Sequence, residues 1–137
     1  MRLATTQIWV RDQDEAVAFW IDQVGFEVKE DITVPELGFF RWVTVGPKDV
    51  DGTAIVLMAI PGEPVMDDAI RSQVQDVVSR GFATALFFTT DDVRVVYDQL
   101  VAAGVRTTGE PSEQVYGVDF GFQDPSGNHF RVITRRR

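Results

Sequence analysis

The residues that could carry out chemistry in this chain of 137 residues are few in kind. There is one histidine, His129, and there is no cysteine. The lack of cysteine excludes disulfides, thiolate zinc sites, a thiol nucleophile and a redox dithiol. A single imidazole excludes metal sites that need two or three histidines from one chain. His129 could act as a general base, because an imidazole titrates at about pH 6.5, but a histidine beside a turn is more often simply solvated.

Other catalytic motifs and several classes of partner are also excluded. The sequence has no Gly-rich phosphate loop, no Gly-x-Ser-x-Gly elbow and no His-Glu-x-x-His motif. Its 21 acidic and 13 basic residues give a net charge of −8, which repels nucleic acid. No stretch approaches the roughly 20 apolar residues of a membrane span, and the N-terminus lacks a signal pattern. We therefore expect a cytoplasmic protein with no nucleic-acid partner and no membrane partner.

Helix signals and strand alternation predict the elements that must position any site. Asp12 can cap a helix whose apolar residues recur at helical spacing and which Gly25 ends. Alternating and β-branched segments outside this helix predict strands. These strands are expected at residues 5–10, 26–30, 39–45 and 53–60. The first half therefore has the order β-α-β-β-β.

The same order returns in the second half. Asp92 caps a second predicted helix, which Gly104 ends, and strands are expected at residues 83–90, 105–108, 115–123 and 129–134. Between the halves, apolar residues at helical spacing predict a packed connecting helix that ends near Arg80 and Gly81. We expect one α+β domain, 1–137. Its parts are module 1 at about 1–62, a linker helix at about 63–81 and module 2 at about 82–137.

The most specific motif is the turn Asp124-Pro125-Ser126-Gly127-Asn128, which closes the second copy of the repeat. This turn and the paired repeat resemble the vicinal oxygen chelate superfamily of glyoxalase I, extradiol dioxygenases and bleomycin-resistance proteins. The resemblance covers nearly the whole chain and implies two tandem β-α-β-β-β modules. It further implies that they form a curled, eight-stranded, cup-shaped sheet with helices on its outer face. A homodimer is also implied, because members commonly pair modules within one chain or across a dimer.

The superfamily's metal ligands can be compared with this sequence position by position. Its catalytic members hold a divalent metal with His, Gln or Glu, one from each of four strands facing the cup. The matching positions here are Thr5, Leu57 (Met58 if the register shifts by one), Ala85 and Arg131. Leucine and alanine offer no lone pair, and a guanidinium has no acceptor and repels a cation. We therefore expect no metal and no other cofactor.

Strand alternation predicts which other residues face the cup. Thr5, Gln7 and Trp9 should face inward, with Ile8 and Val10 packed under the first helix. In the second half the inward residues should be Ala85, Phe87, Thr89, His129, Arg131 and Ile133. Trp42 and Tyr116 lie on strands whose register the sequence does not fix, and we include them as candidates. Gln7 could contact a ligand or bond across strands, and Trp9 could stack on a cationic or planar ligand or fill the core.

Arg131 is the most unusual inward residue. It could bind a carboxylate or phosphate on a ligand, or it could form an internal ion pair with Asp119. An unpaired buried charge is too costly, so a partner of some kind is required. The ligand-binding candidates are Thr5, Gln7, Trp9, Trp42, Leu57, Phe87, Tyr116, Asp119, His129 and Arg131.

Three functions remain open. The first is a metal-free protein that binds or sequesters a small molecule in the cup, as bleomycin-resistance proteins do. The acidic surface favours a cationic ligand, and the aromatic inward residues favour an aromatic one. The second is a metal-dependent lyase, isomerase or dioxygenase, which rests on the resemblance alone and which the four positions disfavour. The third is a metal-free acid–base enzyme that uses His129 or Asp119.

Overall fold

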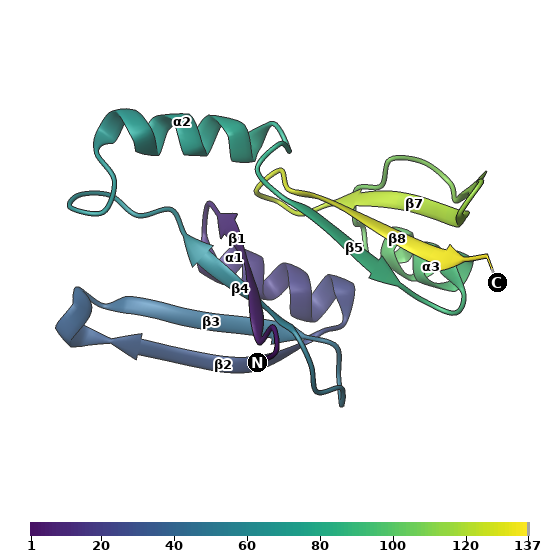
Figure 1. Ribbon diagram of the computed structural model, residues 1–137, viewed down its shortest axis with the longest axis horizontal. Helices are drawn as coiled ribbons and strands as arrows, with labels where there is room; N and C mark the ends of the chain where they lie inside the picture. Colours follow the sequence, from purple (N-terminus) through teal and green to yellow (C-terminus); the bar gives the residue numbers. More distant parts are fainter. Residues whose placement is uncertain (137) are drawn as a thin grey trace.

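The elements of the computed structural model, which describes residues 1–136, follow the predicted repeat (Figure 1). The first half contains β1 (Thr5–Val10), α1 (Gln13–Ala18), the π-helix η1 (Phe19–Val24), β2 (Glu27–Val34), the 3-10 helix η2 (Pro35–Leu37), β3 (Phe40–Gly46) and β4 (Ala54–Ala59). The linker contains α2 (Asp68–Ser79). The second half contains β5 (Ala85–Thr89), α3 (Val93–Ala102), β6 (Ser112–Gln114), β7 (Gly117–Gln123) and β8 (His129–Arg135).

The module helices begin and end at the predicted capping residues. The carboxylates of Asp12 and Asp92 each accept a hydrogen bond from a backbone N–H in the first turn, at 2.8 Å and 3.0 Å. Gly25 and Gly104 follow the helices with φ of 89° and 81°, a left-handed conformation that favours glycine. Because α1 continues directly into η1, residues 13–24 form one helical segment.

The eight strands form two four-stranded sheets. Sheet A has the order β1-β4-β3-β2, and sheet B has the order β5-β8-β7-β6. In each sheet the first strand of the module runs parallel to the fourth, and the other pairs are antiparallel. The predicted α+β fold of two β-α-β-β-β modules is confirmed, with its strands divided between two hydrogen-bonded sheets.

One hydrophobic core joins the outer faces of both sheets. Ile8 and Val10 of sheet A are 1% exposed and belong to this core, as predicted. Trp20, from η1, reaches across to sheet B, where its ring centroid lies 6.2 Å from that of Phe122 and 5.2 Å from that of Phe130. The helical segment 13–24 is therefore shared by the two outer faces. The opposite, inner faces of both sheets lie outside this core.

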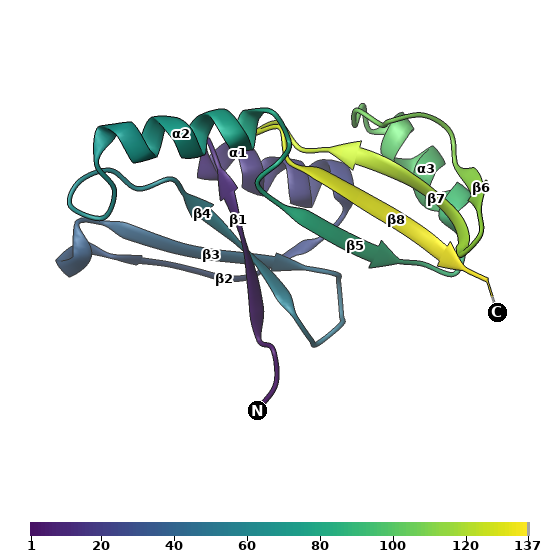
Figure 2. The same ribbon diagram turned by 45° about the horizontal axis from the view of Figure 1, so that its top comes forward.

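The linker helix α2 connects the sheets along one edge of the molecule (Figure 2). Asp67 caps it by accepting from Ile70 N at 2.8 Å, and Gly81, with φ of 82°, follows its C-terminal end, as predicted. Its apolar residues are less covered than the sequence predicts, because Val78 is buried whereas Ile70 and Val77 are exposed. Within residues 1–136 no helix is long and apolar enough to cross a bilayer.

The turn between β7 and β8 ties the second module to the first. Asn128 is fully buried, and its Nδ2 donates to the backbone oxygen of Trp9 and to Asp124 Oδ2, each at 2.9 Å. In the same region the backbone N–H of Arg11 donates to Ser126 Oγ at 2.9 Å. The side chains of this turn therefore fix the end of β1 against sheet B.

The predicted strand at residues 105–108 is wrong. Only Thr107 forms a bridge, to Phe122, and the sixth strand lies later, at Ser112–Gln114. The chain leaves the sheet after Thr108, because Gly109 has φ of 136° and turns the backbone away. The second strand also differs, since β2 continues to Val34 rather than ending at residue 30.

Candidate functional site

The inner face of sheet A is aromatic and apolar. Trp9 of β1 is in register with Met58 of β4, and Trp42 of β3 is in register with Ile32 of β2. Trp42 is half-buried, and its Nε1 donates to Glu30 Oε1 at 3.3 Å. These side chains offer a surface on which a planar molecule can stack, with one carboxylate beside it.

The remaining candidates from β1 lie on the same face. Gln7 is exposed and in register with Val56, and Thr5 is half-buried and in register with Ala54. Trp9 also lines a small cavity of about 280 Å³ with Val74 of α2. The inward placement predicted for β1 by alternation is therefore observed.

The predicted inward placement of Leu57 is wrong. Leu57 is 0% exposed and belongs to the core under the first helix. Its backbone oxygen accepts from Gln13 Nε2 at 2.9 Å, which ties β4 to α1. The inner position is taken by Met58, the alternative that a register shift of one residue allowed, because adjacent strand residues point to opposite faces.

The inner face of sheet B combines an exposed aromatic ring with a polar network. Phe87 is 71% exposed and in register with Arg131 of β8. Arg131 is in register with Gly121 on its other side, and a Cβ on that glycine would lie 3.1 Å from Arg131 Nη1. The glycine therefore leaves room for the guanidinium. Phe87, Arg131 and Gly121 line one cavity of about 230 Å³.

The predicted ion pair between Asp119 and Arg131 is observed. Arg131 Nε donates to Asp119 Oδ2 at 2.8 Å, and the hydroxyl of Tyr116 donates to the same oxygen at 2.8 Å. The bond from Arg131, together with that from Tyr116, holds the pKa of Asp119 below its usual range, although burial opposes this shift. The side chain of Asp119 is 3% exposed and that of Arg131 is 42% exposed. A carboxylate beneath the face therefore holds a guanidinium whose remaining N–H groups are open to a ligand.

His129 lies at one end of the sheet B inner face, in register with Ala85. Its Nε2 lies 2.8 Å from Gln123 Nε2, within hydrogen-bond distance. The ring lies directly against Gly81, where a Cβ would come within 2.1 Å of His129 Cδ2. This packing leaves His129 held between the linker and β7.

The structure divides the predicted site residues between two faces. Thr5, Gln7, Trp9 and Trp42 lie on sheet A, and Phe87, Asp119, His129 and Arg131 lie on sheet B, with Tyr116 just before β7. Sequence reasoning missed Glu30, Ile32 and Gln123. A β-bulge between Val28 and Glu30 changes the alternation along β2, and no residue of the sequence marks that bulge.

A divalent metal does not fit the four positions at which catalytic superfamily members hold one. Leu57 faces the core, Ala85 has no donor atom, and Arg131 places a cation paired with Asp119 on the inner face. Among residues 1–136, no group of three or more His, Asp or Glu side chains is arranged to hold a metal ion.

Comparison with known proteins defines the class. The family model of the Glyoxalase/Bleomycin resistance protein/Dioxygenase superfamily matches residues 2–132, and the chain belongs to this superfamily. The uncharacterized protein YurT of Bacillus subtilis is 32% identical over 98% of this chain and 100% of its own length.

Two solved structures are similar along nearly the whole chain. UcmS2 has a TM-score of 0.87 and 35% identity, covering 97% of each chain. TnmS3, an antibiotic binding protein from Streptomyces sp. CB03234, has a TM-score of 0.74 and 26% identity, covering 99% of this chain and 97% of its own. The superfamily and fold implied by the sequence are therefore confirmed.

Proposed function

We propose that this protein binds a small aromatic molecule between the inner face of a sheet A and the inner face of a sheet B. No metal ion takes part in this binding. The observation that carries the proposal is the pairing of an aromatic surface with an ion pair where a metal would otherwise lie. Trp9 and Trp42 supply stacking surfaces on sheet A, and Phe87 supplies one on sheet B.

Polar groups on the two faces favour particular substituents of the ligand. The unused N–H groups of Arg131 can donate to a carbonyl or an oxyanion, and Asp119 and Tyr116 hold the guanidinium in place. Glu30, beside Trp42, can attract a cationic substituent, which agrees with the net charge of −8. TnmS3, described as an antibiotic binding protein, supports a binding role over a catalytic one.

The test is a titration with a panel of aromatic antibiotics, each available with and without a carbonyl or cationic substituent. Binding should raise the melting temperature and quench fluorescence from Trp9 and Trp42, whereas Trp20 lies in the core. Arg131→Ala should weaken binding by about tenfold or more, because a hydrogen bond from a charged donor is lost. Arg94→Ala, on the exposed surface of α3, serves as the matched control. A panel that gives neither stabilisation nor quenching would contradict the proposal.

We further propose that the site is completed by a second copy of the chain, with sheet A of one copy facing sheet B of the other. Several large apolar side chains on or near the inner faces are exposed, including Ile32 at 51%, Phe39 at 72% and Phe87 at 71%. The charges are complementary, because Glu30 lies on sheet A and Arg131 on sheet B. A two-fold pair of this kind would form two equivalent sites.

Light scattering after size exclusion tests this arrangement. The wild-type protein should have twice the chain mass of 15.4 kDa. Phe87→Glu should shift the protein to a monomer, because it places a charge in the apolar contact. The control is Val95→Glu, at an exposed apolar position on the outer helix α3, and it should leave the dimer intact. A wild-type monomer, or a Phe87→Glu dimer of unchanged stability, contradicts the arrangement.

A further inference from the structure

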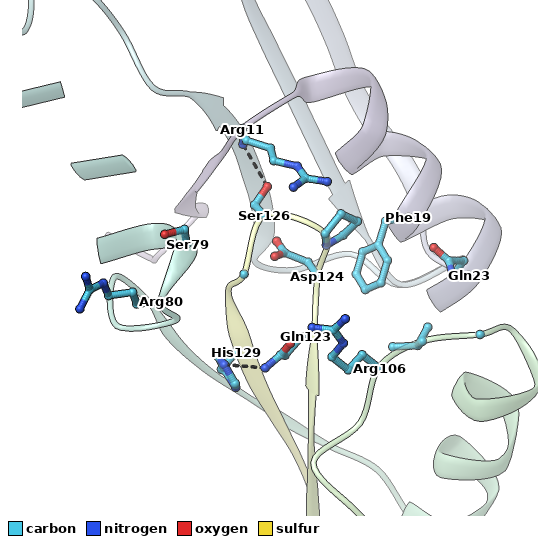
Figure 3. A pocket seen from close by; sticks show the side chains of 14 residues that line it. Arg11, Phe19, Gln23, Ser79, Arg80, Arg106, Gln123, Asp124, Ser126 and His129 are labelled. Atoms are coloured by element: carbon cyan, nitrogen blue, oxygen red, sulfur yellow. Dashed lines mark hydrogen bonds between the residues drawn. The ribbon is translucent and has the colours of Figure 1, made fainter. Parts of the chain in front are cut away.

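A further cavity lies along the seam between the two modules. It has a volume of about 630 Å³, and its walls come from both modules and the linker. Arg11 precedes α1, Phe19 belongs to η1, Arg80 ends α2, and Arg106 follows α3 (Figure 3). The turn from Asp124 to Gly127 supplies the remaining wall. We refer to this cavity as the seam groove.

One hydrogen bond between the modules and one within module 2 fix the walls of the seam groove. The backbone N–H of Arg11 donates to Ser126 Oγ at 2.9 Å, and the backbone N–H of Gln123 donates to the oxygen of Arg106 at 2.9 Å. Gly127 packs closely on α2, since a Cβ there would lie 2.5 Å from the backbone oxygen of Ser79. The groove is therefore present before any ligand binds, which lowers the cost of binding.

The seam groove carries an excess of positive charge in an otherwise acidic protein. Three arginines and one aspartate line it, whereas the whole chain has a net charge of −8. Arg11 is paired with Glu15, and Arg80 is paired with Asp76. None of the ion pairs formed among residues 1–136 involves Arg106.

Asp124, the one acidic residue that lines the groove, does little to neutralise the positive charge of Arg106. Both oxygens of Asp124 accept hydrogen bonds from Asn128, at 2.8 Å and 2.9 Å, so they are engaged inside the turn. Burial raises the pKa of Asp124, which disfavours its charged form. Figure 3 shows Arg11 and Arg106 on opposite sides of Asp124 and Phe19, whereas the side chain of Arg80 extends away from them beside Ser79.

We propose that the seam groove binds a small organic anion through Arg106. A phosphate or carboxylate oxygen would accept from the Arg106 guanidinium, which matches both groups in geometry. The amide of Gln123 and the free N–H groups of Arg11 lie along the same groove. Phe19 and Pro125 supply apolar contacts for the rest of the molecule. The groove shares His129 with the sheet B inner face, but it is not lined by Arg131, Phe87 or the tryptophans of the inner-face site, and the proposal does not depend on that site.

Two matched pairs of probes test the proposal and distinguish the two anions. AMP is compared with adenosine, and benzoate is compared with benzamide, by calorimetry and by backbone amide chemical shifts. At least one anion should bind about tenfold more tightly than its neutral partner, and the shifts should centre on Ser126 and Gly127. Binding of AMP without benzoate indicates a phosphate site, and the reverse indicates a carboxylate site; either outcome supports the proposal.

Variants then identify the residue responsible. Arg106→Ala should reduce affinity for the anion by about tenfold or more, Arg106→Lys should retain part of it, and Arg94→Ala should leave it unchanged. Arg131→Ala should also leave it unchanged, which separates this site from the inner-face site. Equal binding of charged and neutral probes, no binding of either anion, or an Arg106→Ala variant with wild-type affinity would overturn the proposal.

Discussion

Replacing Trp20 by alanine is expected to lower the free energy of unfolding by about 3–5 kcal/mol, the usual cost of emptying a large aromatic site in a core. Trp20 is 0% exposed. Its ring contacts five others, with centroids 5.2 to 6.2 Å away, from Phe19, Phe26, Phe88, Phe122 and Phe130. Three of these phenylalanines belong to the second module, so the substitution removes contacts between the modules as well as volume.

Urea unfolding followed by far-UV circular dichroism measures this effect. A domain of this size has a total stability of about 5–15 kcal/mol, so the loss is a large fraction of it. Trp20→Phe keeps an aromatic ring, so its loss of unfolding free energy should be smaller. This variant still measures the effect if the alanine variant does not fold. The matched control is Trp42→Ala, since Trp42 is half-buried on an inner face and outside the core. Equal losses for Trp20→Ala and Trp42→Ala would contradict a core that depends on Trp20.

The fold could be predicted because its signals are local. Asp12 and Asp92 cap helices by contacts within one turn, and Gly25 and Gly104 end them by a backbone conformation that favours glycine. Each of these signals is complete within a short segment. The same signals occur again in the second half of the chain, and this repetition predicted two similar modules. The segment 105–108, expected as a strand, forms only the single bridge from Thr107 to Phe122, because the chain turns away from β7 at Gly109.

The candidate site could be predicted only as far as strand alternation holds. On β1 and β8 the alternation is uninterrupted, so the inward placement of Gln7, Trp9 and Arg131 followed from it. On β4 the position was taken from the resemblance to the superfamily and not from alternation, and an error of one residue put Leu57 on the wrong face. The bulge before Glu30 had no sequence signal at all.

The arrangement of the inner faces could not be predicted from either module alone. It depends on the packing of the helical segment 13–24 between the outer faces, which Trp20 fixes through rings of the second module. The seam groove arises from the same packing, because Arg11 and Arg106 are far apart in the sequence and approach only when the modules join. The side on which a residue of one strand points can therefore be predicted from the sequence, whereas the contacts between the two modules cannot.

Asn128 is the residue whose loss should most weaken the seam outside the aromatic core. Its Nδ2 donates to the backbone oxygen of Trp9 and to Asp124 Oδ2, and it is fully buried. Asn128→Ala should lower the free energy of unfolding by about 2 kcal/mol at neutral pH, because the buried Asp124 carboxylate and the part-buried oxygen of Trp9 lose a donor. The loss is not larger, because alanine also removes Asn128 Oδ1, which is buried without a partner.

The effect of Asn128→Ala should depend on pH through Asp124. Burial raises the pKa of Asp124 in the folded protein, and the bonds from Asn128 oppose that rise. Without the side chain of Asn128 the folded pKa rises further above the unfolded value of about 4. A carboxyl with a raised folded pKa weakens the fold when ionised, and this penalty disappears as pH falls through the folded pKa to below the unfolded one. The difference between wild type and variant should therefore shrink as pH falls from neutral towards 4.

Urea unfolding of both proteins across this pH range measures the difference directly. The double variant Asn128→Ala with Asp124→Ala provides the control, because it removes the carboxylate that the single variant leaves without its donor. The double variant should show no such pH-dependent penalty, and a cycle with both single variants measures the coupling between the two residues. A difference between wild type and Asn128→Ala that stays constant with pH would mean that the bond to Trp9, rather than the stranded Asp124 carboxylate, accounts for the loss.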